Sequence, residues 1–288
     1  MQGNSESVSI YCQDGYQLGG CFYPHAGEFS QKLPILICPA TGILQKFYQH
    51  FACWLTAQGF DVLTFDFRGI GKSLHGKLKN SQASIQDWGM LDIPAAIDYV
   101  LAKTQQTQVI LIGHSAGGQL LGVVPNYGKV AKFIGVAAST GYVKKLKGKT
   151  KILAPVMFDF IFPISNYFMG YGAIQILGMG ENLPKNVANQ WRAFCKHAGY
   201  IENAIGKTIS EDFHSQITIP MTIIYASDDE IATQANVEDL LRLYPQAQKK
   251  TIRLEPRAWR HPYIGHMGFF KRSHQNLWQL IRKELDLV

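Results

Sequence analysis

Short apolar runs alternate with amphipathic segments along most of this chain, and this alternation constrains the fold most strongly. After an opening hairpin (residues 7–12 and 16–23), it predicts strands at residues 34–38, 60–66, 109–112, 130–138, 221–225 and 249–254. Helices are predicted at residues 45–58, at 84–103 with a kink near Pro94, and at 237–243 and 272–285. Strands separated by helices favour a parallel sheet. We therefore predict an α/β fold with a mostly parallel central sheet and helices on both faces.

One long segment, residues 141–215, interrupts this alternation. It is rich in aromatic residues and shows no run of comparable strand quality. Pro155, Pro163 and Pro184 are expected to break its helices. We interpret it as an inserted, mostly helical cap, so that residues 1–140 and 216–288 form the core. The cap could be a packed subdomain only, or its aromatic walls could also line a pocket for an apolar ligand.

The composition narrows the class of protein. The chain has 288 residues, of which 47% are hydrophobic, so it can bury a substantial core. Its formal net charge is +7, concentrated in the C-terminal third and in a group of lysines at positions 144, 145, 147, 149 and 151. No nucleic-acid-binding module accompanies this charge, so we interpret the lysine group as a solvated surface and expect no nucleic-acid partner.

The N-terminal segment and the cysteines indicate the cellular compartment. The N-terminal segment is polar and lacks the pattern of a secretory signal, and the five cysteines are scattered without a C-x-x-C pair. Both features favour a reducing cytoplasm. Residues 160–180 contain no charged side chain, but four glycines and Pro163 argue against a membrane span, so no transmembrane segment is expected. The oligomeric state cannot be inferred from the sequence.

Residues 113–117 read Gly-His-Ser-Ala-Gly and directly follow the predicted strand at 109–112. This G-x-S-x-G pattern is typical of a nucleophile elbow, a sharp turn from a strand into a helix that exposes a serine hydroxyl. Gly113 and Gly117 would allow the close approach of backbone that the turn requires. The apolar stretch after the pattern is interpreted as the helix. Ser115 is the candidate nucleophile, although the pattern also occurs in ordinary turns.

A serine hydroxyl needs a base within hydrogen-bond reach and a carboxylate that orients the base. The expected chain order is serine, then an acid, then histidine. Three carboxylates, at positions 228–230, follow the strand at 221–225, and His261 and His266 follow the last strand. The order of the residues therefore fits a catalytic triad, with the acid and the base each open to more than one assignment.

These motifs together resemble the α/β-hydrolase superfamily over nearly the whole chain. Residues 66–73 are similar to its D-x-R-G-x-G-x-S loop, and residues 226–233 to its acid loop. The acid-loop match implies Asp229 rather than Asp228 as the acid. A Gly-His pair at 265–266 matches the superfamily's base, which implies His266 rather than His261.

An oxyanion hole needs two backbone N–H donors fixed before charge develops. Ala116, directly after the nucleophile, is one candidate. The resemblance implies Ile43 as the second, because Thr41-Gly42 stands where many members have His-Gly.

We expect a serine hydrolase that cleaves a carboxylic ester or thioester with an apolar acyl part through an acyl-enzyme. An acyltransferase with the same triad and a non-catalytic binding protein on this fold are the alternatives. The predicted partner is a small-molecule ester. No cofactor is expected, and the sequence has no metal-binding motif.

Overall fold

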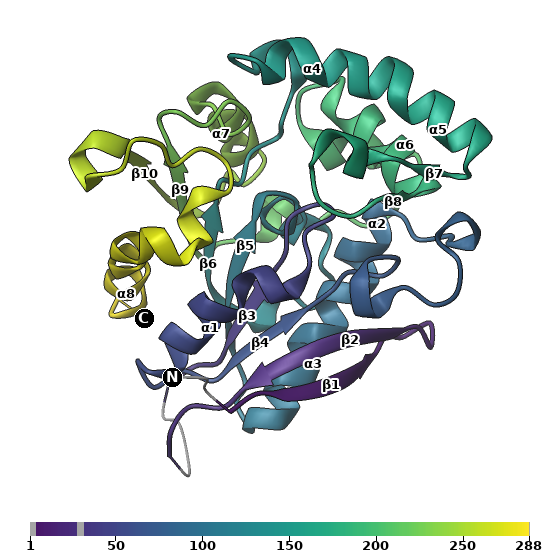
Figure 1. Cartoon of the computed structure of the whole chain (residues 1–288). Helices are drawn as coiled ribbons and strands as arrows, with labels where there is room; N and C mark the ends of the chain where they lie inside the picture. Colours follow the sequence, from purple (N-terminus) through teal and green to yellow (C-terminus); the bar gives the residue numbers. More distant parts are fainter. Residues whose placement is uncertain (1–3, 28–31, 288) are drawn as a thin grey trace.

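The central element of the protein is an eight-stranded sheet with strand order β1-β2-β4-β3-β5-β6-β9-β10 (Figure 1). The computed structural model describes residues 4–27 and 32–287. The strands are β1 (Glu6–Tyr11), β2 (Gln17–Tyr23), β3 (Ile35–Cys38), β4 (Val62–Phe65), β5 (Val109–His114), β6 (Val130–Val136), β9 (Pro220–Ala226) and β10 (Gln248–Leu254). Within the described part of this sheet, only the pairings that β2 makes with β1 and β4 are antiparallel, which confirms the predicted, mostly parallel sheet.

Side chains of the central strands alternate between two apolar layers. In β5, Val109 and Leu111 belong to one buried cluster, and Ile110 and Ile112 belong to the other. Because successive strand residues point to opposite faces, a strand buried on both faces reads as a continuous apolar run. This explains why the strands could be located from apolar runs alone.

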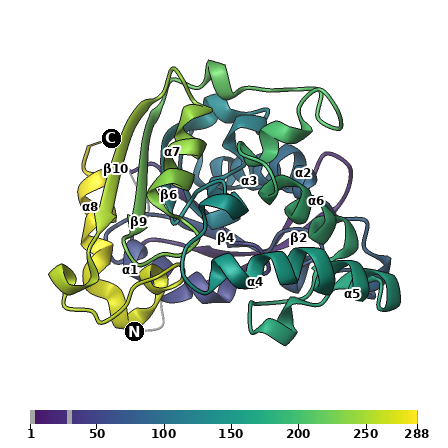
Figure 2. The ribbon, with the colours of Figure 1, turned by 90° about the horizontal axis from the view of Figure 1, so that it is seen from above.

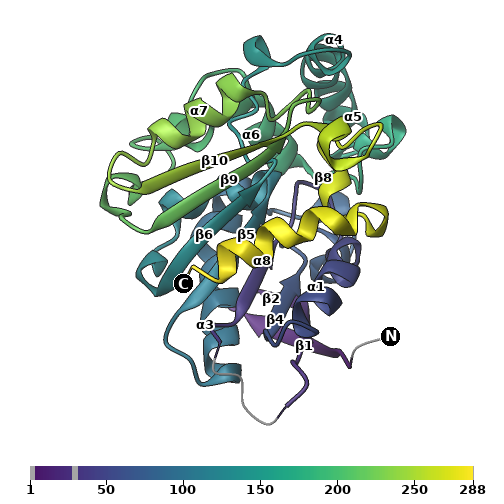
Figure 3. The same cartoon turned by 90° about the vertical axis from the view of Figure 1, so that its left-hand side faces the viewer.

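Helices cover both faces of the sheet, as predicted. Helices α1 (Gln49–Thr56) and α8 (Gln279–Leu285) lie on one face (Figure 3). Their residues Phe51 and Ile281 are fully buried. On the opposite face lie α3 (Ile93–Thr104) and α7 (Gln234–Arg242). Each fully buried large apolar side chain contributes about 2 kcal/mol to folding.

The helical region around Pro94 contains the expected irregularity. Ser84 forms a capping box with Asp87 at the start of α2 (Ile85–Asp87). A π-helical turn at Trp88–Asp92 then leads into α3, which has Pro94 in its first turn. Since proline has no N–H to donate, the wider turn accommodates it without ending the helical path.

The expectation of a helix after the G-x-S-x-G pattern was wrong. Three 3₁₀ turns connect β5 to β6, at Ser115–Gly118, Leu121–Val123 and Tyr127–Lys129. Glycines at 117, 118 and 122 disfavour an α-helix energetically. Gly122 also lies against the His214 ring, where an added Cβ would come within 2.1 Å of it. Close packing thus keeps this connection small and irregular.

Between β6 and β9 the chain forms the segment that we call the cap (residues 141–215). It contains α4 (Thr150–Val156), α5 (Phe162–Phe168), α6 (Lys185–Cys195) and the two-residue strands β7 (Tyr171–Gly172) and β8 (Leu183–Pro184). Figure 2 shows α4 and α5 running end to end along one side of the molecule.

Pro155 and Pro163 were expected to break the first helix of the cap, but the helical path continues through both of them. A π-helical turn at Met157–Ile161 joins α4 to α5, so the helical path is continuous from Thr150 to Phe168. Pro155 lies inside α4, and Pro163 lies in the first turn of α5.

Within the described ranges, no helix has the length and apolarity needed to cross a bilayer.

Candidate active site

Ser115 lies on a strained turn at the carboxyl end of β5. Its φ is +47°, in the left-handed region that non-glycine residues rarely adopt. Glycine is required on both sides of it. A Cβ at Gly117 would lie 2.3 Å from the Cys38 carbonyl oxygen, and one at Gly113 would lie 2.5 Å from the Gly117 carbonyl oxygen. The close packing of this turn against β3 holds the strained serine in place.

A hydrogen-bonded chain connects Ser115, His266 and Asp229. The Ser115 hydroxyl lies 2.9 Å from His266 Nε2, and His266 Nδ1 lies 2.8 Å from Asp229 Oδ2. A carboxylate accepts only, so Nδ1 carries the proton and Nε2 is free to accept the serine proton. Burial opposes ionisation of Asp229, yet the neighbouring His266 and hydrogen bonds hold the pKa of this carboxyl below its usual range. The arrangement suits activation of a serine nucleophile.

The other candidate acid and base have different partners. The Asp228 carboxylate accepts hydrogen bonds from the backbone N–H groups of Ile264 and Gly265, both at 2.9 Å. Asp228 therefore holds the backbone that precedes His266, whereas Asp229 holds its ring. His261 Nε2 pairs with Asn276 Oδ1 at 2.7 Å, and the His261 ring stacks on His274. Neither residue is hydrogen-bonded to the Ser115–His266 pair.

The structure corrects the expectation for Ile43. Its amide donates a 3.0 Å hydrogen bond to the Ala40 carbonyl, because Gly42, at φ +69°, turns the chain back on itself. By contrast, the amides of Thr41 and Ala116 donate no hydrogen bond to the described part of the chain. Both residues are buried, and Thr41 lines the same cavity as Ser115. Thr41 is thus the better placed partner for Ala116.

A second, largely buried network joins three loops of the site. His114 Nε2 lies 3.0 Å from the His266 carbonyl oxygen, so this nitrogen carries the proton and donates. His114 Nδ1 then accepts from the Tyr48 hydroxyl at 2.7 Å, and the Tyr48 oxygen accepts from the Ala40 amide at 2.9 Å. The network connects the loop of Ala40, the elbow and the backbone of His266. The histidine beside Ser115 was its one sign in the sequence.

The buried His114 makes stability depend on pH. Burial, together with the neighbouring His266, lowers the pKa of His114 from 6.5 to about 3. The unfolded chain binds this proton below about pH 6.5 while the folded chain does not, so stability falls on acidification. Between pH 7 and pH 5, His114 alone should cost about 2 kcal/mol of unfolding free energy.

Urea unfolding of the parent protein and of His114→Asn at the two pH values tests this. The variant should lose about 2 kcal/mol less than the parent between them, whatever its stability at pH 7. Equal losses in the two proteins would show that His114 does not titrate in this way.

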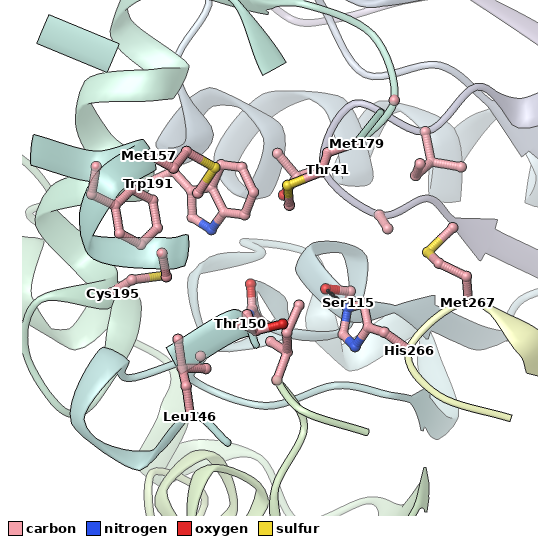
Figure 4. Close-up of a pocket in the computed structure, with 18 of the residues that line it drawn as sticks. Thr41, Ser115, Leu146, Thr150, Met157, Met179, Trp191, Cys195, His266 and Met267 are labelled. Atoms are coloured by element: carbon pink, nitrogen blue, oxygen red, sulfur yellow. Dashed lines mark hydrogen bonds between the residues drawn. The ribbon is translucent and has the colours of Figure 1, made fainter. Parts of the chain in front are cut away.

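A cavity of about 260 Å³ extends from Ser115 and His266 into the cap (Figure 4). Its far end is lined by cap side chains, among them Trp191, Met157 and Cys195, which Figure 4 shows across the cavity from Ser115. No Asp, Glu, Lys or Arg is among the described residues that line it. The cavity therefore suits an uncharged, largely apolar group.

Glu230 connects the acid loop to the cap, a role that the sequence did not indicate. Its carboxylate accepts from the Thr150 N–H at 2.8 Å, the Thr150 hydroxyl at 2.7 Å and the Lys149 N–H at 3.2 Å. These hydrogen bonds, those of Thr150 above all, hold the pKa of Glu230 below its usual range. The residue after Asp229 thus satisfies amides at the start of α4, one wall of the cavity.

Comparisons with known proteins find hydrolases that are similar to this chain. The family model described as serine aminopeptidase, S33, matches residues 31–167. The chain is 30% identical to the Caenorhabditis elegans lipase lipl-3 over 204 residues, covering 62% of this chain and 48% of the lipase. It is 26% identical to human gastric triacylglycerol lipase over 182 residues, covering 55% and 46%. The chain spans less than half the length of these relatives.

Solved structures of other proteins superpose on nearly the whole of this chain. A soluble variant of monoglyceride lipase from Saccharomyces cerevisiae superposes with a TM-score of 0.70 at 17% identity, covering 98% of this chain and 94% of that one. An esterase from Pyrococcus furiosus gives 0.63 at 15%, covering 98% and 90%. The sheet order and these superpositions define an α/β-hydrolase fold. The matching family model and the shared fold support membership of the α/β-hydrolase superfamily.

Proposed function

We propose that this protein is a serine hydrolase that cleaves a carboxylic ester or thioester with an apolar acyl part. The observation that carries the proposal is the hydrogen-bonded chain from Ser115 through His266 to Asp229, which opens into an uncharged cavity. The lipases and esterases among the similar proteins support the same chemistry.

In the proposed mechanism, Ser115 Oγ attacks the acyl carbonyl while His266 Nε2 takes the hydroxyl proton. His266 then gives this proton to the leaving alcohol or thiol, and Asp229 stabilises the imidazolium in between. Water hydrolyses the acyl-enzyme with His266 as the base. The amides of Ala116 and Thr41 are the proposed oxyanion donors, each worth about 3 kcal/mol of transition-state stabilisation.

The cavity favours acyl groups over peptides that carry a free amino terminus. An α-ammonium group bound in a buried site needs a carboxylate partner, and none lines the described cavity. Its volume of about 260 Å³ lies just below the usual range for drug-sized ligands, which favours short to medium acyl chains. We therefore propose acyl specificity despite the aminopeptidase name of the matching family model.

The cytoplasmic location stays a prediction.

A series of p-nitrophenyl esters of increasing acyl length tests the acyl pocket. Each methylene buried in the cavity should raise kcat/KM about fourfold, until the cavity is filled. Ala154→Phe places a large side chain at the buried wall and should abolish this gain while leaving acetate hydrolysis nearly unchanged. Ala193→Phe, on the exposed side of α6, is the matched control. If Ala154→Phe kept the chain-length preference of the parent, the acyl group would bind elsewhere.

A further inference from the structure

The outer face of the cap's first helix is unusually apolar. Seven large apolar residues point outward along the continuous helical path from Thr150 to Phe168, and we call them the outer apolar face: Ile152, Leu153, Val156, Phe160, Ile164, Tyr167 and Phe168. Tyr167 is 82% exposed and Phe168 is 78% exposed. Most members recur every three or four residues, the spacing that places side chains on one side of a helix. Soluble monomers seldom expose a contiguous apolar surface of this kind without a binding role.

The fold itself does not need this face. The opposite side of the same helix carries the buried Ala154, Met157 and Phe158, and Phe158 packs edge-on against Trp191 at 5.6 Å. These inward side chains line the cavity and secure the helix to α6. Since packing is complete on the inner side, the outward residues are available to an external partner.

Positive charge gathers at one end of the outer apolar face. Five exposed lysines precede or begin the helix, at positions 144, 145, 147, 149 and 151. None of their ammonium groups forms an ion pair with the part of the chain that the structure describes. The one acidic residue of the helix, Asp159, pairs with Arg192 and Lys196 of α6. The surface is therefore apolar with a cationic end and no free acid.

We propose that the outer apolar face and the five lysines bind the surface of an anionic lipid bilayer. An amphipathic helix with an apolar side and adjacent lysines lies in the plane of such an interface, its apolar side chains among the lipid tails and its ammonium groups at the headgroups. A second copy of the chain fits less well, because its outer apolar face has no free carboxylate to pair with these lysines.

Docking in this way would place the cavity beside the lipid phase. The helix is the shared wall, with Ala154 and Met157 facing the cavity and Val156 and Phe160 facing outward. An acyl group in the bilayer would then lie one helix away from the cavity. This consequence rests on the proposed ester hydrolysis, whereas binding to the bilayer does not.

Flotation of the full-length Ser115→Ala protein with vesicles tests binding without turnover. We expect binding to phosphatidylcholine vesicles that contain phosphatidylglycerol, and at least tenfold weaker binding without it. Phe160→Ser/Tyr167→Ser/Phe168→Ser should also reduce binding at least tenfold. Tyr11→Ser/Leu287→Ser, equally exposed but elsewhere, should leave it unchanged. The triple variant with an intact Ser115 should hydrolyse a soluble short ester at the parent rate, which shows that it is folded.

Charge-reversal variants distinguish the effect of these particular lysines on vesicle binding from the effect of the protein's net charge. Lys144→Glu/Lys145→Glu should weaken vesicle binding at least tenfold, while Lys249→Glu/Lys271→Glu, with the same change in net charge, should not. Equal effects of the two pairs, or vesicle binding unaffected by the triple variant, would overturn the proposal. So would a dimer that the triple variant dissociates in a protein that does not bind vesicles, because the occupant would then be a second copy.

Discussion

Ser115→Ala is expected to lower kcat/KM for ester hydrolysis by at least about 10⁴-fold, with the fold retained. The hydroxyl lost is the only one hydrogen-bonded to His266 among the described residues. Alanine fits the space, and removal of the hydroxyl leaves the +47° φ and the flanking glycines unchanged. The rate is measured with the preferred p-nitrophenyl ester, and the fold is checked by thermal unfolding.

Ser139→Ala is the matched control for this substitution. Ser139 is also buried, just beyond the carboxyl end of β6, and its hydroxyl makes one long hydrogen bond to the Ile231 carbonyl. We expect its rate to stay within a few fold of the parent. If Ser115→Ala hydrolysed the ester as fast as Ser139→Ala, the serine mechanism would be wrong.

Asp229→Asn should reduce kcat by about 10⁴-fold. An asparagine amide donates a hydrogen bond to His266 Nδ1, which moves the ring proton to Nε2. The ring then cannot accept the Ser115 proton at 2.9 Å. Backbone bonds from Ile231 and Ala232 to the retained oxygen at position 229 should preserve the loop.

The adjacent Asp228→Asn separates a catalytic acid from a structural one. Among the described residues, the Asp228 carboxylate is hydrogen-bonded only to two backbone amides of the loop before His266. Its substitution by asparagine removes one of these two hydrogen bonds, at a cost of about 1–2 kcal/mol. We expect a loss of stability with a rate within about tenfold of the parent. A larger loss of kcat in Asp228→Asn than in Asp229→Asn would reverse the assignment of the acid.

The sheet and the main residues of the site were predictable because they depend on local signals. Strands such as β5 are buried on both faces and therefore appear as apolar runs in the sequence. Ser115, Asp229 and His266 come after the strands β5, β9 and β10 respectively. Parallel strands bring their carboxyl ends to one edge. The sequence therefore located these three side chains at a common edge, although not the hydrogen bonds between them.

Features set by packing between distant segments were not predictable. The missing helix after Ser115 depends on His214 lying against Gly122, and the hydrogen bonds of Glu230 depend on where α4 begins. The misassigned Ile43 depends on the turn at Gly42. Each is a contact or turn that a one-dimensional pattern does not encode.

The outer apolar face could not be predicted from the sequence for a related reason. The sequence showed an uncharged stretch at residues 160–180, but Pro155 and Pro163 favoured broken helices, which hid the spacing of its apolar residues. The π-helical turn at Met157–Ile161 accommodates Pro163 and keeps the helix continuous. Only the folded cap shows which residues face the cavity and which face outward.

Labelling with a fluorophosphonate, followed by peptide mapping, tests directly whether Ser115 is the nucleophile. The reagent forms a phosphorus–oxygen bond with an activated serine and releases fluoride, so it reports the nucleophile without any assumption about the natural substrate. We expect one adduct, on Ser115, together with loss of esterase activity, and greatly slowed labelling in His266→Ala. Labelling at another serine, or full inactivation without an adduct on Ser115, would contradict this expectation.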